Sequence, residues 1–228
     1  MESISKRISN LSPAKKKLLE LRMKQQKAKN QQLKQELKPI PRTEKLPLSL
    51  IQQGIWDIEQ LQPGKSSFNL PISCRLVGDL NQEILVKSIN EIVKRHEALR
   101  TCFYSENKQQ FQKTLPNISL SLPIIDLRAI DSEERIIAQQ KIAFEEASQP
   151  FDLEKAPLLR VKLLILQEQE HLLLVTMHHG VADIWSLGIF LQELPIIYQA
   201  FLTDKPYILP ELPIQYADFV YWQKQSLQ

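Results

Sequence analysis

Two adjacent histidines, His178 and His179, followed four residues later by Asp183, form the group of side chains in this sequence best suited to chemistry. The pair ends an apolar stretch that predicts a strand and precedes an amphipathic stretch that predicts a helix. Neighbouring strand residues point to opposite faces, so one histidine is expected to be structural while the other can face a cavity. A histidine placed there could accept a proton from a nucleophile at neutral pH.

Residue types alone leave two other interpretations of this group open. A metal site would use two of His178, His179 and Asp183, but it lacks a clear third ligand because His96 and His171 belong to other patterns. Alternatively, both histidines end the strand and form only local hydrogen bonds. Taken alone, an adjacent histidine pair favours this purely structural interpretation.

The rest of the sequence predicts a mixed sheet with helices packed on it, of the α/β or α+β class. Asn81 is a predicted helix cap, and the spacing of Leu85, Ile89, Ile92 and His96 places them on one buried face of the helix that follows. An amphipathic segment is expected at residues 50–61, and further helices at 132–147, 185–202 and 214–227. Strands are expected at residues 70–76, 99–104, 109–114, 119–125, 158–166 and 171–177.

Charge is divided unevenly along the chain. Residues 1–45 hold 13 Lys or Arg against 4 Glu, whereas the whole chain of 228 residues has a net charge of only +3. Ser12 and Pro13 are a good helix start, and residues 14–37 are mostly strong helix formers, so we expect a basic helical linker or docking arm. This arm has no aromatic residue for base stacking and no regular apolar face. We therefore expect neither nucleic acid nor a membrane as a partner.

The composition, with 43% hydrophobic and 24% charged residues, indicates one substantial globular core. Cys74 and Cys102 are the only cysteines, which argues against a disulfide scaffold and fits a reducing cytoplasm. No N-terminal apolar segment indicates a secretory signal, and the longest apolar runs are too short to span a bilayer. The sequence thus predicts a cytoplasmic protein whose folded domain covers residues 46–228.

Four blocks of sequence follow one another in a characteristic order: residues 48–71, residues 95–103, residues 178–183 and residues 216–223. The third block is similar to the HHxxxDG motif. The second, Arg-His-Glu-Ala-Leu-Arg-Thr-Cys-Phe, is similar to another motif of the same family. Together the blocks resemble the N-terminal lobe of the condensation domains of nonribosomal peptide synthetases, members of the chloramphenicol acetyltransferase-like superfamily. The resemblance extends from about residue 46 to the end, and the basic arm is similar to linkers that precede such domains.

This resemblance implies two similar lobes arranged in a V, with the active site between them and no bound cofactor or metal. The substrates would be acyl and aminoacyl groups on the phosphopantetheine arms of peptidyl or acyl carrier proteins. His179 corresponds to the catalytic histidine, which would orient the attacking amine or take its proton, and His178 corresponds to its supporting neighbour.

The resemblance also implies that Asp183 orients the loop through an ion pair with an arginine. We expect Arg100 to be that partner, because alternation along residues 99–103 places it opposite the apolar side chains. A charge there needs a partner or a water-filled cavity. Arg100 and Asp183 could instead hold the fold without touching a substrate.

The sequence departs from the family pattern in three ways. Ile184 stands where the family has glycine, and a β-branched residue is strongly disfavoured if that backbone position requires a positive φ. Gly54 stands where many members have arginine. The chain ends where the second lobe would begin, so a C-terminal condensation lobe or neighbouring synthetase modules are expected partners.

One function and two alternatives follow. The chain is expected to be the N-terminal part of a condensation domain that joins a carrier-bound acyl thioester to an aminoacyl acceptor, and to be inactive in isolation. The alternatives are a non-catalytic docking or scaffold fragment, and a stand-alone acetyltransferase of the chloramphenicol type whose trimer would rebuild the site between protomers. The blocks around Gln60 and Arg95 favour the synthetase branch.

Overall fold

The structure, a computed structural model, describes residue 22, residues 37–42 and residues 45–227. Its main sheet has four strands in the order β2 (Asn69–Val77), β7 (Glu170–His178), β6 (Leu159–Gln167) and β5 (Ile124–Asp126). Strand β7 is antiparallel to both β2 and β6, whereas β5 runs parallel to β6. The expected mixed sheet is confirmed.

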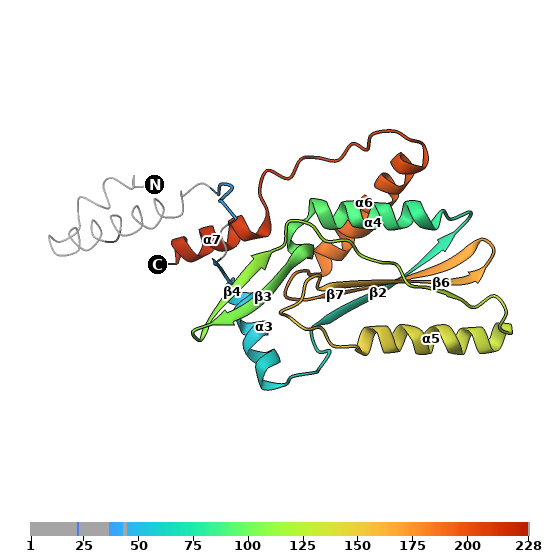
Figure 1. Ribbon diagram of the computed structural model, residues 1–228, viewed down its shortest axis with the longest axis horizontal. Helices are drawn as coiled ribbons and strands as arrows, with labels where there is room; N and C mark the ends of the chain where they lie inside the picture. Colours follow the sequence, from blue (N-terminus) through green and yellow to red (C-terminus); the bar gives the residue numbers. More distant parts are fainter. Residues whose placement is uncertain (1–21, 23–36, 43–44, 228) are drawn as a thin grey trace, which may run out of the picture.

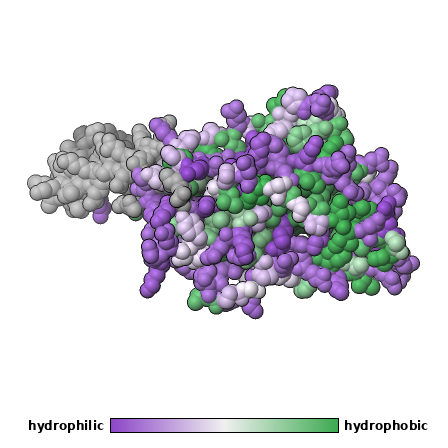
Figure 2. Space-filling model, in the orientation of Figure 1, coloured by the Kyte–Doolittle hydropathy of each residue, from purple (hydrophilic) through white to green (hydrophobic). Residues whose placement is uncertain are grey.

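Helices cover both faces of this sheet (Figure 1). Helices α4 (Gln82–Arg95) and α6 (Ile184–Leu202) pack against each other on one face, and α5 (Ser132–Ser148) lies on the other. Because both faces are covered, β6 and β7 are buried at most positions, including runs of consecutive residues, rather than at every second one. Figure 2 shows hydrophilic side chains over much of this view of the molecule, with hydrophobic surface gathered toward the end away from α7.

A second sheet of three strands has the order β1 (Leu46–Pro47), β4 (Gln109–Thr114) and β3 (Thr101–Glu106). The predicted hairpin is confirmed, and its turn residues Asn107 and Lys108 both have positive φ, as a two-residue turn between twisted strands requires. Strand β3 begins two residues later than predicted. Residues Glu97–Arg100 form a short 3-10 helix, η1, instead.

The strand predicted at residues 119–125 is present only as β5, which begins at Ile124. Upstream of it, the backbone of Leu120 is held by one side chain of α4. Asn90 accepts a hydrogen bond from the Leu120 amide at 2.7 Å and donates one to the Leu120 carbonyl at 3.0 Å. The amide side chain thereby satisfies the two groups that a neighbouring strand would have paired.

The predicted cap and buried face of α4 are confirmed. The side chain of Asn81 accepts a hydrogen bond from the amide of Ile84, and Leu85, Ile89 and Ile92 are all buried. His96 is the exception, because the helix ends at Arg95 and His96 is its C-terminal cap.

Helix α7 (Tyr216–Ser226) is attached to the segment that precedes β1 through one buried carboxylate. The side chain of Asp218 is 1% exposed; it forms an ion pair with Arg42 and accepts hydrogen bonds from the amides of Ile40 and Gln215. Burial opposes the ionisation of Asp218, but these hydrogen bonds outweigh it and lower its pKa. Asp218 is thus joined to Arg42 and Ile40, which lie 176 and 178 positions earlier in the chain.

Most of the predicted basic arm, residues 1–45, lies outside the described residues, so its helix stays a prediction. Among the residues that the structure describes, no helix is long and apolar enough to cross a bilayer.

We predict that replacing Arg42 by Ala lowers the free energy of unfolding by about 1–3 kcal/mol at pH 7, because it leaves the buried carboxylate of Asp218 without its cation. The folded-state pKa of Asp218 is lowered, so this stabilisation is complete above the unfolded pKa of about 3.9 and is lost as the pH falls through the folded value. Urea denaturation of the two proteins at several pH values measures both effects.

The control is Lys155→Ala, which removes an exposed ion pair with Asp152 and is expected to change nothing measurable. Equal stability of wild type and Arg42→Ala at pH 7 would show that the pair does not hold α7.

Candidate active site

The end of β7 is hydrogen-bonded on both sides. The amide of His178 donates to the carbonyl of Leu158 at 3.0 Å, and the amide of His179 donates to the carbonyl of Phe68 at 2.8 Å. The chain then turns, and the carbonyl of His178 accepts hydrogen bonds from the amides of Val181 and Ala182. This turn leads directly into α6, so the position of the loop is set by the sheet.

His178 points into the protein and is 2% exposed. Its ring lies edge-on between Phe68 and Phe151, with ring centroids 6.2 and 5.8 Å away. Burial lowers the pKa of His178 to about 4, so the ring is neutral at pH 7. Its Nδ1 atom accepts a hydrogen bond from the amide of Gly180 at 3.1 Å, which places the ring proton on Nε2.

His179 points the other way and is exposed. Its Nδ1 atom lies 2.8 Å from the carbonyl oxygen of Ala182, and because a carbonyl can only accept, Nδ1 carries the proton. In the neutral ring, the lone pair is therefore on Nε2. The two rings occupy different environments, as strand alternation predicts, and only His179 can receive a proton from a bound molecule.

The divergence of the two rings also bears on the metal-site interpretation. His178 and His179 lie on opposite sides of the strand end, so they do not converge on one point. Over residues 37–42 and 45–227, no three His, Cys, Asp or Glu side chains are grouped closely enough to hold a metal ion. The geometry gives the metal-site interpretation no support.

Asp183 is the N-terminal cap of α6. Its carboxylate accepts hydrogen bonds from the amide of Ser186 at 2.8 Å and from the Ser186 hydroxyl at 2.7 Å, while the amide of Asp183 donates to that hydroxyl. Burial opposes ionisation, but the two hydrogen bonds outweigh it and lower the pKa of Asp183. Asp183 thus caps α6 directly after the loop.

Ile184 is the first residue of α6 and is not among the residues with positive φ. Its side chain is 75% exposed and meets no steric obstacle in the helical conformation. The strain expected from a β-branched residue at this position is therefore absent. The loop of this chain does not require glycine there.

The predicted ion pair between Arg100 and Asp183 is wrong. Arg100 donates hydrogen bonds to the carbonyls of Leu115 and Pro116 and lies 3.6 Å from Glu97, so it ties η1 to the end of β4. The prediction assumed a strand at Arg100, but that residue lies in the 3-10 helix, where side chains do not alternate between two faces. The hydrogen-bond and ion-pair partners of Arg100, which are Leu115, Pro116 and Glu97, lie outside the histidine loop at residues 178–183.

Gln52 of α3 (Leu50–Leu61) is a contact of the loop that the sequence interpretation missed. It is 4% exposed, and its Nε2 atom donates to the carbonyl of Gly180 at 3.0 Å. Its Oε1 atom accepts from the amide of Ser49, whose hydroxyl accepts from the amide of Gln52. This reciprocal capping box fixes the side chain, and the Ser-x-x-Gln spacing that signals it was present in the sequence.

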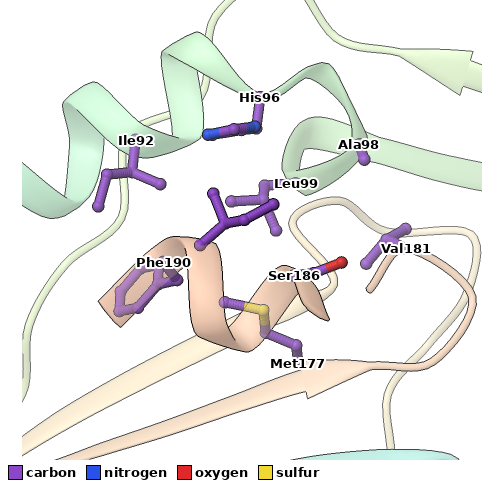
Figure 3. A pocket seen from close by; sticks show the side chains of 9 residues that line it. Ile92, His96, Ala98, Leu99, Met177, Val181, Ser186 and Phe190 are labelled. Carbon is purple, nitrogen blue, oxygen red and sulfur yellow. The ribbon is translucent and has the colours of Figure 1, made fainter. Parts of the chain in front are cut away.

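An apolar pocket of about 80 Å³ lies beside the loop, between α4, η1 and α6. In Figure 3, Val181 lines it from the loop, Ser186 from the first turn of α6, and His96 from the end of α4. The ring of His96 is held by Glu193, which is 2.7 Å away. The other lining residues are Ile92, Ala98, Leu99, Met177, Ile189 and Phe190. This volume is that of a few water molecules, or of a small aliphatic group.

We predict that Gly180→Ala lowers the free energy of unfolding by about 1–3 kcal/mol, because the new methyl group would lie 2.8 Å from a ring carbon of Phe103, which is 2% exposed and has little room to move. Thermal or urea denaturation measures this. The matched control is Gly188→Ala in α6, where nothing lies within 4 Å and the substitution is expected to be neutral or stabilising. A loss of stability only at position 188 would contradict the described packing.

We predict that Asp183→Ala costs about 1 kcal/mol through the loss of the cap on α6, whereas Asp183→Asn, which keeps an acceptor oxygen, costs less. Urea denaturation at pH 7 measures both losses. If Asn proves as damaging as Ala, the charge of Asp183 matters rather than its capping hydrogen bonds.

Known proteins share both the sequence and the fold of this chain. Residues 42–228 match the family described as "Condensation domain". Chondramide synthase cmdD of Chondromyces crocatus is 39% identical over 188 residues, which are 82% of this chain but 5% of that protein. Phosphinothricin tripeptide synthetase PhsC of Streptomyces viridochromogenes is 35% identical over 231 residues, 100% of this chain and 21% of that protein. The chain thus spans a small part of these relatives.

Solved structures agree. The X-domain from teicoplanin biosynthesis superimposes with a TM-score of 0.74 and 28% identity over 84% of this chain and 40% of that one. The starter condensation domain of rhizomide synthetase RzmA, at 19% identity, shares the fold with a TM-score of 0.73 over 80% of this chain and 44% of that one. With its sheet, its histidine loop and the match over residues 42–228, the chain belongs to the condensation-domain family of nonribosomal peptide synthetases.

Proposed function

We propose that this segment, working within a larger synthetase, forms an amide bond between an acyl thioester on one carrier protein and the amino group of an aminoacyl thioester on another. The observation that carries this proposal is the ring of His179. Its Nδ1–H is held by the carbonyl of Ala182, and the residue is exposed directly after the end of β7.

His179 would need to assist an amine that is already partly unprotonated near neutral pH. An α-amino group has a pKa of about 8, so part of it is unprotonated near neutral pH. Its nitrogen attacks the thioester carbonyl carbon, the C–N bond forms and the C–S bond breaks, and the amine proton ends on the departing thiol. The Nε2 atom of His179 would orient the amine, or take its proton and return it to sulfur. No bond between the acyl group and the protein is needed.

In this proposal, carrier proteins bring both substrates on phosphopantetheine arms, and the chain binds no cofactor of its own. Because the chain covers only a small share of its relatives, a C-terminal condensation lobe and neighbouring synthetase modules are proposed as further partners. Cys74 and Cys102 are free thiols, which supports a cytoplasmic setting.

A non-catalytic docking domain is the second candidate. One solved relative, an X-domain from teicoplanin biosynthesis, is described in complex with another protein, OxyB, and is 28% identical to this chain. Several relatives are instead named as synthases or synthetases, including a tripeptide synthetase. These names favour condensation over both docking and the trimeric acetyltransferase of the chloramphenicol type.

We predict that His179→Ala, in the polypeptide that contains this segment, lowers the turnover of carrier-bound acyl and aminoacyl substrates by about 10²–10⁴-fold, because the proton acceptor is lost. Mass spectrometry of the amide product on the acceptor carrier measures the rate.

The matched control is His171→Leu, a buried histidine at the opposite end of β7, about 26 Å along the strand. It should leave the rate unchanged. An unaltered rate in His179→Ala would reject His179 as the acid–base group, and no product in the wild type would favour the docking candidate.

A further inference from the structure

A buried histidine ring and a partly buried carboxylate face each other behind the histidine loop. The Nε2 atom of His178 has no hydrogen-bond partner, although the residue is 2% exposed. The carboxylate of Glu59, on α3, lies 3.6 Å from it, and the side chain of Glu59 is only 11% exposed. Over residues 37–42 and 45–227, neither side chain forms a second ion pair, so each is the available partner of the other.

The chemistry of the two groups is complementary. Because the Gly180 amide donates to Nδ1 of His178, the proton of the neutral ring is on Nε2, facing the carboxylate. A buried donor left unpaired costs about 1–3 kcal/mol, whereas a hydrogen bond to a charged acceptor is among the stronger ones. The separation of 3.6 Å is longer than a hydrogen bond, whose N···O distance is about 2.7–3.2 Å, so the two groups must approach by about half an ångström to form one.

The other neighbours of this ring do not compete for its proton. The rings of Phe68 and Phe151 flank it on either side. Arg160, the nearby cation, stacks on Phe151 and is bonded to Glu146, so it is not available to Glu59. The acceptor that remains for the Nε2–H of His178 is the carboxylate of Glu59 on α3.

We propose that Glu59 is a positioning residue, whose carboxylate accepts the Nε2–H of His178 and thereby selects the ring tautomer that holds the loop. With the opposite tautomer, the ring Nδ1–H would face the amide hydrogen of Gly180, and the hydrogen bond that shapes the loop could not form. The importance of this loop for catalysis rests on the function proposed above, but the contact itself does not.

A second contact from the same helix supports the assignment. Gln52 lies seven residues before Glu59, two helical turns earlier on the same face of α3, and binds the carbonyl of Gly180. Helix α3 would therefore hold the loop at two points, through the backbone at Gly180 and through the ring of His178. His179 lies between His178 and Gly180 in the sequence. Both contacts with α3 would therefore fix the position of its ring.

The test is nuclear magnetic resonance of the histidine ring nitrogens in the full chain. We expect His178 to carry its proton on Nε2 in the wild type and in Glu59→Gln, whose amide oxygen is still an acceptor. In Glu59→Leu we expect a mixture of tautomers or the Nδ1–H form, and exchange of the Gly180 amide with solvent at least about tenfold faster. The matched control is Asp57→Leu, an exposed position on the same helix that should change neither reading.

An Nδ1–H tautomer in the wild type would overturn the proposal without any variant, so it stays testable even if Glu59→Leu fails to fold. A Glu59→Leu protein with the wild-type tautomer and the wild-type Gly180 exchange rate would also overturn it. These readings need no substrate. A failure of amide formation in the wild type would count against the proposed function and leave the assignment of Glu59 standing.

Discussion

Strand β7 is hydrogen-bonded along both of its edges, to β2 and to β6, up to the residue where it ends. A strand held on both edges cannot shift by one residue without moving every side chain to the other face of the sheet. The consequence at its end is that His178 must point inward and His179 outward. The site therefore depends on the register of a buried sheet, and the loop only has to complete the orientation of one exposed ring.

The parts of this arrangement that depend on neighbours in sequence were predictable. The alternation of His178 and His179, the cap at Asn81 and the hairpin around Asn107 are local patterns, and the structure contains all three. The family resemblance rests on the same local blocks. Strand ends and helix starts were predicted to within a few residues because the apolar runs of β6 and β7 are interrupted by polar turns.

The parts that failed depend on contacts between distant residues. The side chain of Arg100 was predicted to face Asp183 from the alternation of a strand, but the chain forms a 3-10 helix there. Its guanidinium instead binds the carbonyls of Leu115 and Pro116, 15 and 16 residues later. No strand forms around Leu120, because the side chain of Asn90, 30 residues earlier, binds the backbone amide and carbonyl that a neighbouring strand would have paired. Glu59 approaches His178 from a helix more than a hundred residues away, and no spacing in the sequence reveals such a pair.

The buried carboxylate of Asp218 has a practical consequence for where this domain can be cut. The first strand, β1, begins at Leu46 and the family match begins at residue 42, so either looks like a natural start for a shortened gene. A start at 46 would delete both Arg42 and the Ile40 amide, and a start at 42 would still delete the latter. An expression boundary for this chain is better chosen by what α7 binds than by where the first strand begins.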